Sequence, residues 1–178
     1  LLLDGIFTVL DLYEHFVEEK FHVLYNDINE ITLRNEQNIQ NFENDKNARM
    51  GHYKSLAVSF YIYNSLIHKI VNEFSFNTTD SFVKKIKNEG DDVGIISRVT
   101  SRYDVEFIHN SYGEYFAALY LFEHNPYKAR ERKFISNSRY KNIRFFLDLM
   151  LARNSKYLVG WSLYVKHVLI LLNYYFRT

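Results

Sequence analysis

The sequence VEFIHNSYGEYFAALYLFEHN at residues 105–125 changes its pattern at a single histidine, His109. Before it, Val105 and Phe107 alternate with Glu106 and Ile108, and a period of two favours a strand. After it, aromatic and aliphatic residues recur at helical spacing and leave little polar surface, which is typical of a buried helix. The stretch therefore predicts a short strand that runs directly into a core helix, with His109 at the junction.

The start of this helix reads Ser111-Tyr-Gly-Glu114, which fits a capping box. We expect the Ser111 hydroxyl to accept from the backbone N–H of Glu114, whose carboxylate reaches back. Unpaired N–H groups and a partial positive charge make such a helix N-terminus a site where phosphates bind. His109 can add a side-chain donor there. The local pattern alone favours the simpler interpretation, in which His109 only hydrogen-bonds at the edge of the core.

The composition is that of a globular protein, with 178 residues of which 47% are hydrophobic and 24% charged. The 15 tyrosines and 15 phenylalanines can build an aromatic core. Because 22 basic residues face 21 acidic ones, no global field indicates a nucleic-acid partner. The chain has no cysteine, which excludes disulfides and thiolate zinc sites and is compatible with a reducing compartment.

The two ends of the chain resemble cuts through a longer protein, and the sequence Leu-Leu-Leu-Asp at the start does not predict a signal peptide. Residues 157–176 are apolar over almost the length of a membrane span, but Lys166 and His167 lie at their middle. A central lysine costs about 2.5–3.5 kcal/mol on insertion. We therefore expect a buried or interface helix, no membrane contact and a cytoplasmic location.

The rest of the chain is mostly helical in pattern. Apolar residues recur at helical spacing over residues 6–25 and 53–71, and a short helix carrying Phe82 is expected from Thr79 or Asp80 to about Gly90. Residues 26–50 are polar, with asparagine at every third position from 35 to 47. They predict a polar insert with at most one weak helix.

Two β-rich runs within residues 94–109 flank a polar segment at residues 100–104, which predicts a hairpin. Helices followed by a hairpin match a winged helix. Pro126 ends the central helix, a basic run covers 128–144, and further helices are expected at 143–152 and 158–176. We expect a mainly α fold with a small β-hairpin, divided into residues 1–125 and 126–178.

Residues 107–121 resemble the Phe-x-His-x-x-Phe-x-Glu-Phe/Tyr-x-Ala-Ala segment that closes the winged-helix domain of NACHT-type signalling ATPases. These are STAND NTPases related to the NOD-like receptors of innate immunity. Order, spacing and residue types agree over about fifteen positions, far more than a short-motif match. Tyr112 stands where the family often has Phe, and Gly113 where many members have Gln. Shorter segments at 10–17 and 94–96 also resemble the family.

The resemblance implies that residues 1–125 are a winged-helix regulatory region and that 126–178 begin a superhelical domain. In the family, the winged helix folds against the upstream nucleotide-binding domain, and its histidine reaches the β-phosphate of ADP to hold a closed, inactive form. Exchange for ATP permits homo-oligomerisation. His109 is therefore expected to be the ADP-binding residue of a longer parent protein. The chain has no Gly-x-x-x-x-Gly-Lys-Ser/Thr loop, so we expect it to bind no nucleotide and catalyse nothing by itself.

Other interpretations remain. The pairs Glu19/His22 and Glu106/His109 have the spacing of carboxylate-bundle metal ligands, but the second lies on a predicted strand, where residues three apart face opposite sides. We expect no metal site and no nucleophile–base pair. The basic run, together with Arg98 and Arg102 on the wing, supports an alternative function as a winged-helix DNA-binding module. The near-zero net charge favours a solvated face instead.

Overall fold

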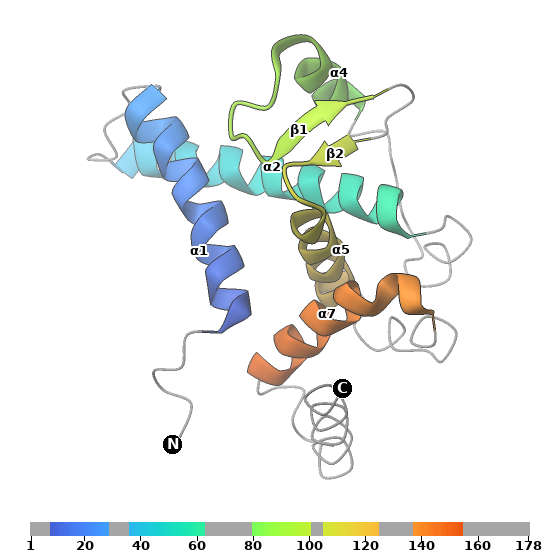
Figure 1. Cartoon of the computed structure of the whole chain (residues 1–178). Helices are drawn as coiled ribbons and strands as arrows, with labels where there is room; N and C mark the ends of the chain where they lie inside the picture. The colour runs from blue at the N-terminus through green and yellow to red at the C-terminus, as the bar shows by residue number, and fades with distance from the viewer. Residues whose placement is uncertain (1–7, 29–35, 63–79, 101–104, 125–136, 155–178) are drawn as a thin grey trace.

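The computed structural model describes residues 8–28, 36–62, 80–100, 105–124 and 137–154 (Figure 1). Their elements, in chain order, are α1 (Val9–His22), a π-helical turn η1 (Val23–Ile28), α2 (Glu36–Tyr61), α4 (Asp80–Glu89), β1 (Ile96–Val99), β2 (Val105–Phe107), α5 (Asn110–His124), a 3₁₀ turn η4 (Ser138–Tyr140) and α7 (Lys141–Arg153). The predicted fold class, mainly α with a small β-hairpin, is confirmed.

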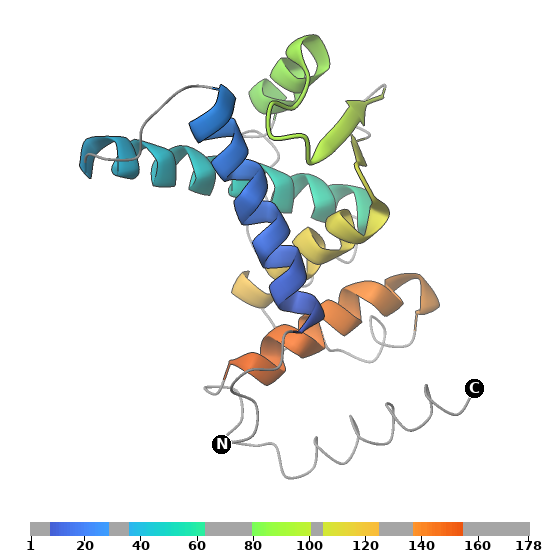
Figure 2. The same ribbon diagram turned by 60° about the vertical axis from the view of Figure 1, so that its left-hand side comes forward.

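Helix α5 lies at the centre, where it packs against α2 on one side and α7 on the other (Figures 1 and 2). Its buried residues are Gly113, Tyr115, Phe116, Ala117, Ala118, Tyr120 and Leu121. The two alanines bring the neighbouring helices close, while the aromatic rings fill the space around them. This confirms that the helix after His109 is a core helix.

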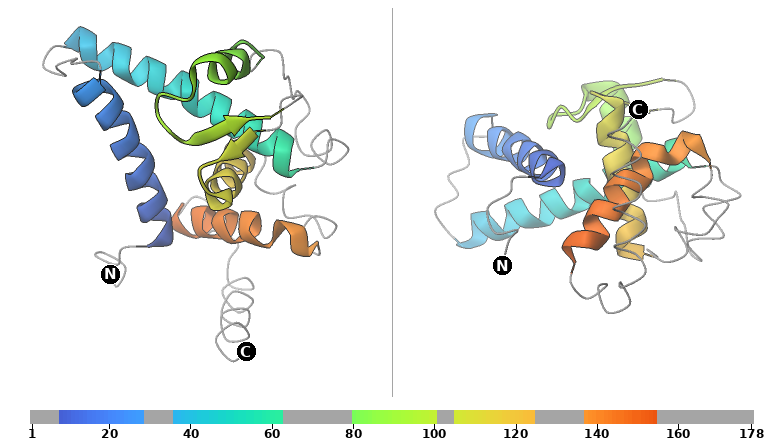
Figure 3. Two further views of the ribbon diagram at one scale, coloured as in Figure 1. Left: turned by 45° about the horizontal axis from the view of Figure 1, so that its top comes forward. Right: turned by 60° about the horizontal axis from the view of Figure 1, so that its bottom comes forward.

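Helix α1 begins with a capping box that sequence reasoning missed. The Asp11 backbone N–H donates to the Thr8 hydroxyl at 3.2 Å, and the Thr8 backbone N–H donates to the Asp11 carboxylate at 2.6 Å. The helix was predicted to start at residue 6, whereas it starts at Val9, directly after its cap Thr8. The first two turns of α1 meet the end of α7, where Arg153 donates to Glu14 at 2.8 Å and pairs with Asp11 at 3.3 Å (Figure 3).

Helix α2 runs without interruption through the segment predicted to be a polar insert. Residues 36–50 form its first half, and the helix predicted from residue 53 is its continuation to Tyr61. Ion pairs one turn apart support the polar half, as between Arg49 and Asp45 at 2.8 Å. Next to this pair, Phe42 is buried against Tyr25, with ring centroids 4.8 Å apart. Residues 63–71 lie outside the described part.

The predicted hairpin is confirmed by an antiparallel pairing of β1 and β2, in which Ile96 faces Phe107 and Val99 faces Val105. Helix α4 precedes it and ends at Glu89, and the next residue, Gly90, has a φ of +88° that glycine readily adopts. The predicted helix at 158–176 and the boundary between 125 and 126 lie outside the described residues. Among those that are described, no helix is both long and apolar enough to cross a bilayer.

Candidate functional site

His109 lies in the two-residue link between β2 and α5, and its side chain is exposed. The link is held to the hairpin, since the Ile108 N–H donates to the Ile95 carbonyl oxygen at 2.9 Å. On the helix side, the Tyr112 N–H donates to the His109 carbonyl oxygen at 3.0 Å. The predicted junction of strand, histidine and core helix is therefore present.

The imidazole of His109 acts as the N-terminal cap of α5. Its Nδ1 accepts from the backbone N–H of Ser111 at 3.2 Å and lies 2.6 Å from the Ser111 hydroxyl oxygen. Ser111 is the second residue of the helix, so its N–H is one of the donors that have no partner within the helix. Among the described residues, no hydrogen bond involves the other ring nitrogen, Nε2.

The predicted capping box of Ser111 and Glu114 is wrong. Because α5 begins at Asn110, Ser111 already lies in the first turn and cannot be the cap. The Glu114 carboxylate accepts instead from the side-chain amide of Asn142 on α7, at 3.0 Å to each oxygen. The spacing of serine and glutamate matched the box, but the helix starts earlier than that pattern requires.

Tyr61, at the end of α2, contacts the first turn of α5. Its hydroxyl donates to the backbone carbonyl of Asn110 at 3.2 Å and lies 3.3 Å from the side-chain oxygen of the same residue. Burial, together with the negative charge of Glu114, raises the pKa of Tyr61 to about 12, so the hydroxyl remains a donor at neutral pH. Sequence reasoning missed this contact, which no local pattern reveals.

A lysine from α1 lies near the same junction. The ammonium of Lys20 is 5.4 Å from the centroid of the Phe16 ring, which stacks on Tyr112 of α5 at 4.6 Å. It also lies 3.6 Å from where a Cβ on Gly94 would be. Gly94 precedes Ile95, whose carbonyl oxygen accepts from the N–H of Ile108, the residue before His109. Lys20 forms no ion pair with a carboxylate among the described residues.

The chemistry available at this junction is hydrogen bonding to an anion. The first turn of α5, the His109 ring and the ammonium of Lys20 all favour negative charge. Although the Ser111 hydroxyl lies close to the imidazole, the same Nδ1 accepts a backbone N–H. The contact is therefore a helix cap, and within the described part of the chain no carboxylate hydrogen-bonds to the ring to complete a triad.

The residues considered as metal ligands are engaged elsewhere. His22 pairs with Glu18 at 3.5 Å, and Glu106 accepts from the guanidinium of Arg98 through two contacts of 2.7 Å. Within the described ranges, no group of three or more histidine or carboxylate side chains is arranged to hold a metal ion.

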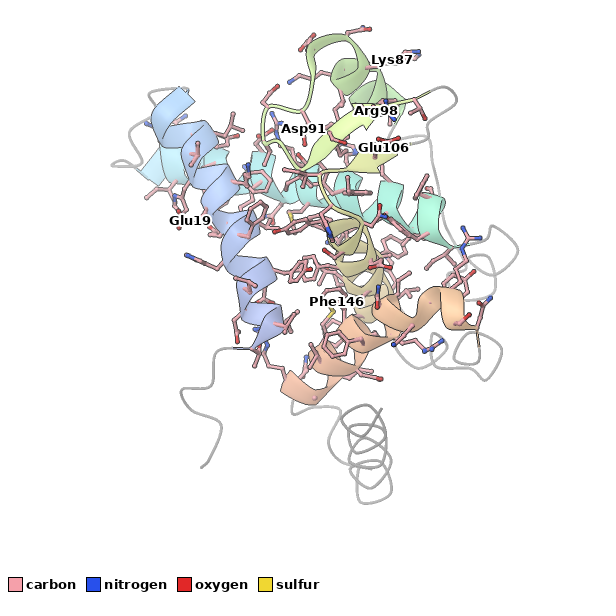
Figure 4. All side chains as sticks on the ribbon, viewed as in Figure 1. Glu19, Lys87, Asp91, Arg98, Glu106 and Phe146 are labelled. Atoms are coloured by element: carbon pink, nitrogen blue, oxygen red, sulfur yellow. The ribbon has the colours of Figure 1, made fainter. Side chains whose placement is uncertain are left out.

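Arg98 of the hairpin and Arg144 of α7 also have partners. The bond to Arg98 lowers the pKa of Glu106, and that carboxylate raises the pKa of Arg98 (labelled in Figure 4). Arg144 donates to the Asn137 carbonyl oxygen at 2.7 Å. Arg102 and the first part of the basic run, up to residue 136, lie outside the described residues.

A surface depression of about 310 Å³ lies between α2 and α4. The residues lining it are Asp45, Ala48, Arg49, His52, Ser81, Phe82 and Lys85. Its charges are balanced, since Arg49 pairs with Asp45 at 2.8 Å and Lys85 with Asp92 at 3.7 Å. His52 stacks on Phe82 at 4.5 Å, and burial, assisted by Arg49, lowers the pKa of His52. Sequence reasoning did not identify this depression.

No family model matches the chain, and neither the curated proteins nor the solved structures contain a match to it.

Proposed function

We propose that this chain is the nucleotide-sensing, autoinhibitory segment of a NACHT-type signal-transduction ATPase, and that it is not catalytic itself. The observation that carries the proposal is the position of His109. The residue is exposed between a β-hairpin and the N-terminus of a buried helix, and only its Nδ1 is used by the described residues. This is the geometry in which a winged-helix histidine can reach a phosphate held by a neighbouring domain.

The proposed mechanism is a closed state that bound ADP stabilises. The upstream nucleotide-binding domain of the parent protein holds ADP, and His109 Nε2 donates to its β-phosphate. A hydrogen bond to a charged group contributes about 1.5–3 kcal/mol. Exchange of ADP for ATP removes this differential contact, so the segment separates and the parent forms homo-oligomers. ADP and ATP are the cofactors of the parent, and this chain without the parent domain binds neither.

The experiment is a His109→Ala substitution in the intact parent protein. Loss of about 1.5–3 kcal/mol shifts the closed–open equilibrium about tenfold or more. We expect faster ADP release, measured by stopped-flow with a fluorescent analogue, and oligomers without a trigger, measured by light scattering. His15→Ala is the matched control, since His15 is exposed on α1 and, among the described residues, pairs only with Glu19, at 4.0 Å.

A second variant distinguishes the loss of the helix cap from the loss of the phosphate contact. Removing a helix cap costs about 0.5–2 kcal/mol, so His109→Ala should also lower the denaturant midpoint. His109→Ser keeps a capping oxygen but is too short to reach a ligand in a neighbouring domain. It should therefore melt close to wild type and still release ADP quickly. A folded His109→Ser parent that stays monomeric with the wild-type ADP release rate would refute the proposed function.

A further inference from the structure

We infer that Ser111 is a positioning residue that holds the His109 imidazole as the Nε2–H tautomer, with its free nitrogen as a hydrogen-bond donor. The role of that donor, which is to bind a phosphate, rests on the proposed function. The tautomer itself does not, because it follows from contacts within this chain.

The argument begins with what each group can do. A neutral imidazole has one donor and one acceptor nitrogen, whereas a backbone N–H can only donate. The Ser111 N–H lies 3.2 Å from Nδ1, so Nδ1 must be the acceptor. The Ser111 hydroxyl, 2.6 Å from the same nitrogen, then donates as well. Two donors on Nδ1 leave the ring proton on Nε2.

This assignment decides what the histidine can bind. A phosphate oxygen only accepts, so a ring that presents Nε2–H attracts it, whereas a ring that presents a lone pair repels it. Two contacts to one nitrogen also restrict rotation of the ring about its side-chain bonds. Ser111 thus orients the histidine in advance, as a partner that holds one nitrogen sets the role of the other.

A second histidine, His124 at the last residue of α5, supplies an internal reference. His124 Nδ1 lies 2.9 Å from the carbonyl oxygen of Tyr120, which can only accept. His124 should therefore carry its proton on Nδ1, the opposite tautomer to His109. The two residues lie at the two ends of α5, so one sample tests both assignments.

The experiment is nitrogen NMR of the imidazole rings in the 178-residue chain, well above the ordinary histidine pKa of about 6.5. We expect Nε2–H for His109 and Nδ1–H for His124. Ser111→Ala removes one of the two donors and should raise the ratio of Nδ1–H to Nε2–H at His109 about fivefold, which corresponds to ~1 kcal/mol. Ser111→Thr keeps the hydroxyl and should restore the wild-type ratio, while His124 stays unchanged throughout.

Two results would overturn the inference: an Nδ1–H tautomer at His109 in the wild-type chain, or a tautomer ratio that Ser111→Ala leaves unchanged. The wild-type spectrum is decisive even if a variant does not fold. A separate measurement on the parent protein addresses the proposed function. If Ser111→Ala shifts the tautomer but leaves ADP release unchanged, the positioning role stands and the phosphate contact is refuted.

Discussion

Gly113 is the residue that lets α2 and α5 meet beside the candidate site. A Cβ at this position would lie 2.2 Å from Cε2 of Tyr61 and 2.8 Å from Cδ2 of Phe107. Real Cβ atoms do not approach other atoms so closely. The bare backbone therefore makes room for the Tyr61 ring, whose hydroxyl donates to Asn110 in the first turn of α5.

We predict that Gly113→Ala destabilises the chain. Overpacking costs about 1–3 kcal/mol, while the better helix propensity of alanine returns up to about 1 kcal/mol. Gly51→Ala is the matched control, because that glycine lies inside α2 with no atom within 4 Å of its missing Cβ. It should stabilise the chain by about 1 kcal/mol. The free energies of unfolding, from denaturant titration, should therefore change in opposite directions.

A double variant tests the cause of this loss. Tyr61→Ala removes the clashing ring, so adding Gly113→Ala to it should cost less than adding it to wild type. The interaction energy from the double-mutant cycle is the measurement. An additive cycle would show that the Tyr61 ring is not what excludes a side chain at residue 113.

At this scale the sequence predicted the place of His109 but not its contacts. Alternation before the histidine and helical spacing after it locate the junction without tertiary information. The cap was assigned wrongly because Ser111 and Glu114 have the spacing of a capping box whether or not the helix starts there. The true cap, His109, lies only two residues before Ser111. The partner of Glu114 is Asn142, which lies on another helix, α7.

Among the elements, the loop between α4 and β1 fixes the hairpin to α2 through one carboxylate, that of Asp91 (Figure 4). One oxygen accepts from the Tyr53 hydroxyl at 2.7 Å, and the other from the backbone N–H groups of Ile95 and Ile96 at 2.9 and 2.8 Å. Burial, aided by the charge of Asp91, raises the pKa of Tyr53. The phenol therefore stays protonated and continues to donate.

We predict that Asp91→Ala destabilises the chain by about 1–3 kcal/mol, because it leaves the buried Tyr53 hydroxyl without this acceptor. Asp92→Ala is the control. Asp92 is exposed and pairs with Arg49 at 3.4 Å and Lys85 at 3.7 Å, and such surface pairs contribute about 0–1 kcal/mol. Thermal unfolding measured by circular dichroism compares the two. Equal losses would mean that Asp91 acts only as another surface charge.

Sequence periodicity predicted α1, α4, the hairpin and α7, which all bury a regular set of apolar residues. It failed at the first half of α2, where polar residues predominate and only Phe42 is deeply buried. That half of the helix depends on contacts with α1 and η1: Lys46 pairs with Glu18, and the Tyr25 hydroxyl donates to Asp45. A local window of sequence contains neither partner, so the helix looked like an insert.

At the scale of the molecule, an aromatic junction joins α1, α5 and α7. The Tyr13 ring meets Phe146 (labelled in Figure 4) edge-on at 4.8 Å and Tyr115 at 5.5 Å, and Tyr115 meets Phe146 at 5.7 Å. The three helices thus share one hydrophobic core, so α7 is integral to the described part of the fold. The division of the chain between residues 125 and 126 stays a prediction.

Two exposed arginines in the described part of the chain are paired with carboxylates. The formal net charge is +1, and the exposed Arg98 and Arg153 each contact carboxylates of the same chain, Glu106 in one case and Asp11 with Glu14 in the other. A surface of paired charges gives little of the long-range field that attracts a phosphate backbone. This bears on the alternative function, a winged-helix DNA-binding module.

We therefore predict no specific DNA binding by this chain. Association should be weak, with a non-specific dissociation constant no tighter than about 10⁻⁴–10⁻⁶ M, and should be lost as salt rises. Fluorescence anisotropy on unrelated duplexes over a salt series measures this. Glu106→Gln supplies a positive control for electrostatics: it removes the carboxylate that faces Arg98 and should strengthen non-specific binding and its salt dependence. Tight, sequence-dependent binding by the wild-type chain at physiological salt would instead favour the DNA-binding module, since paired charges cannot supply discrimination between duplexes.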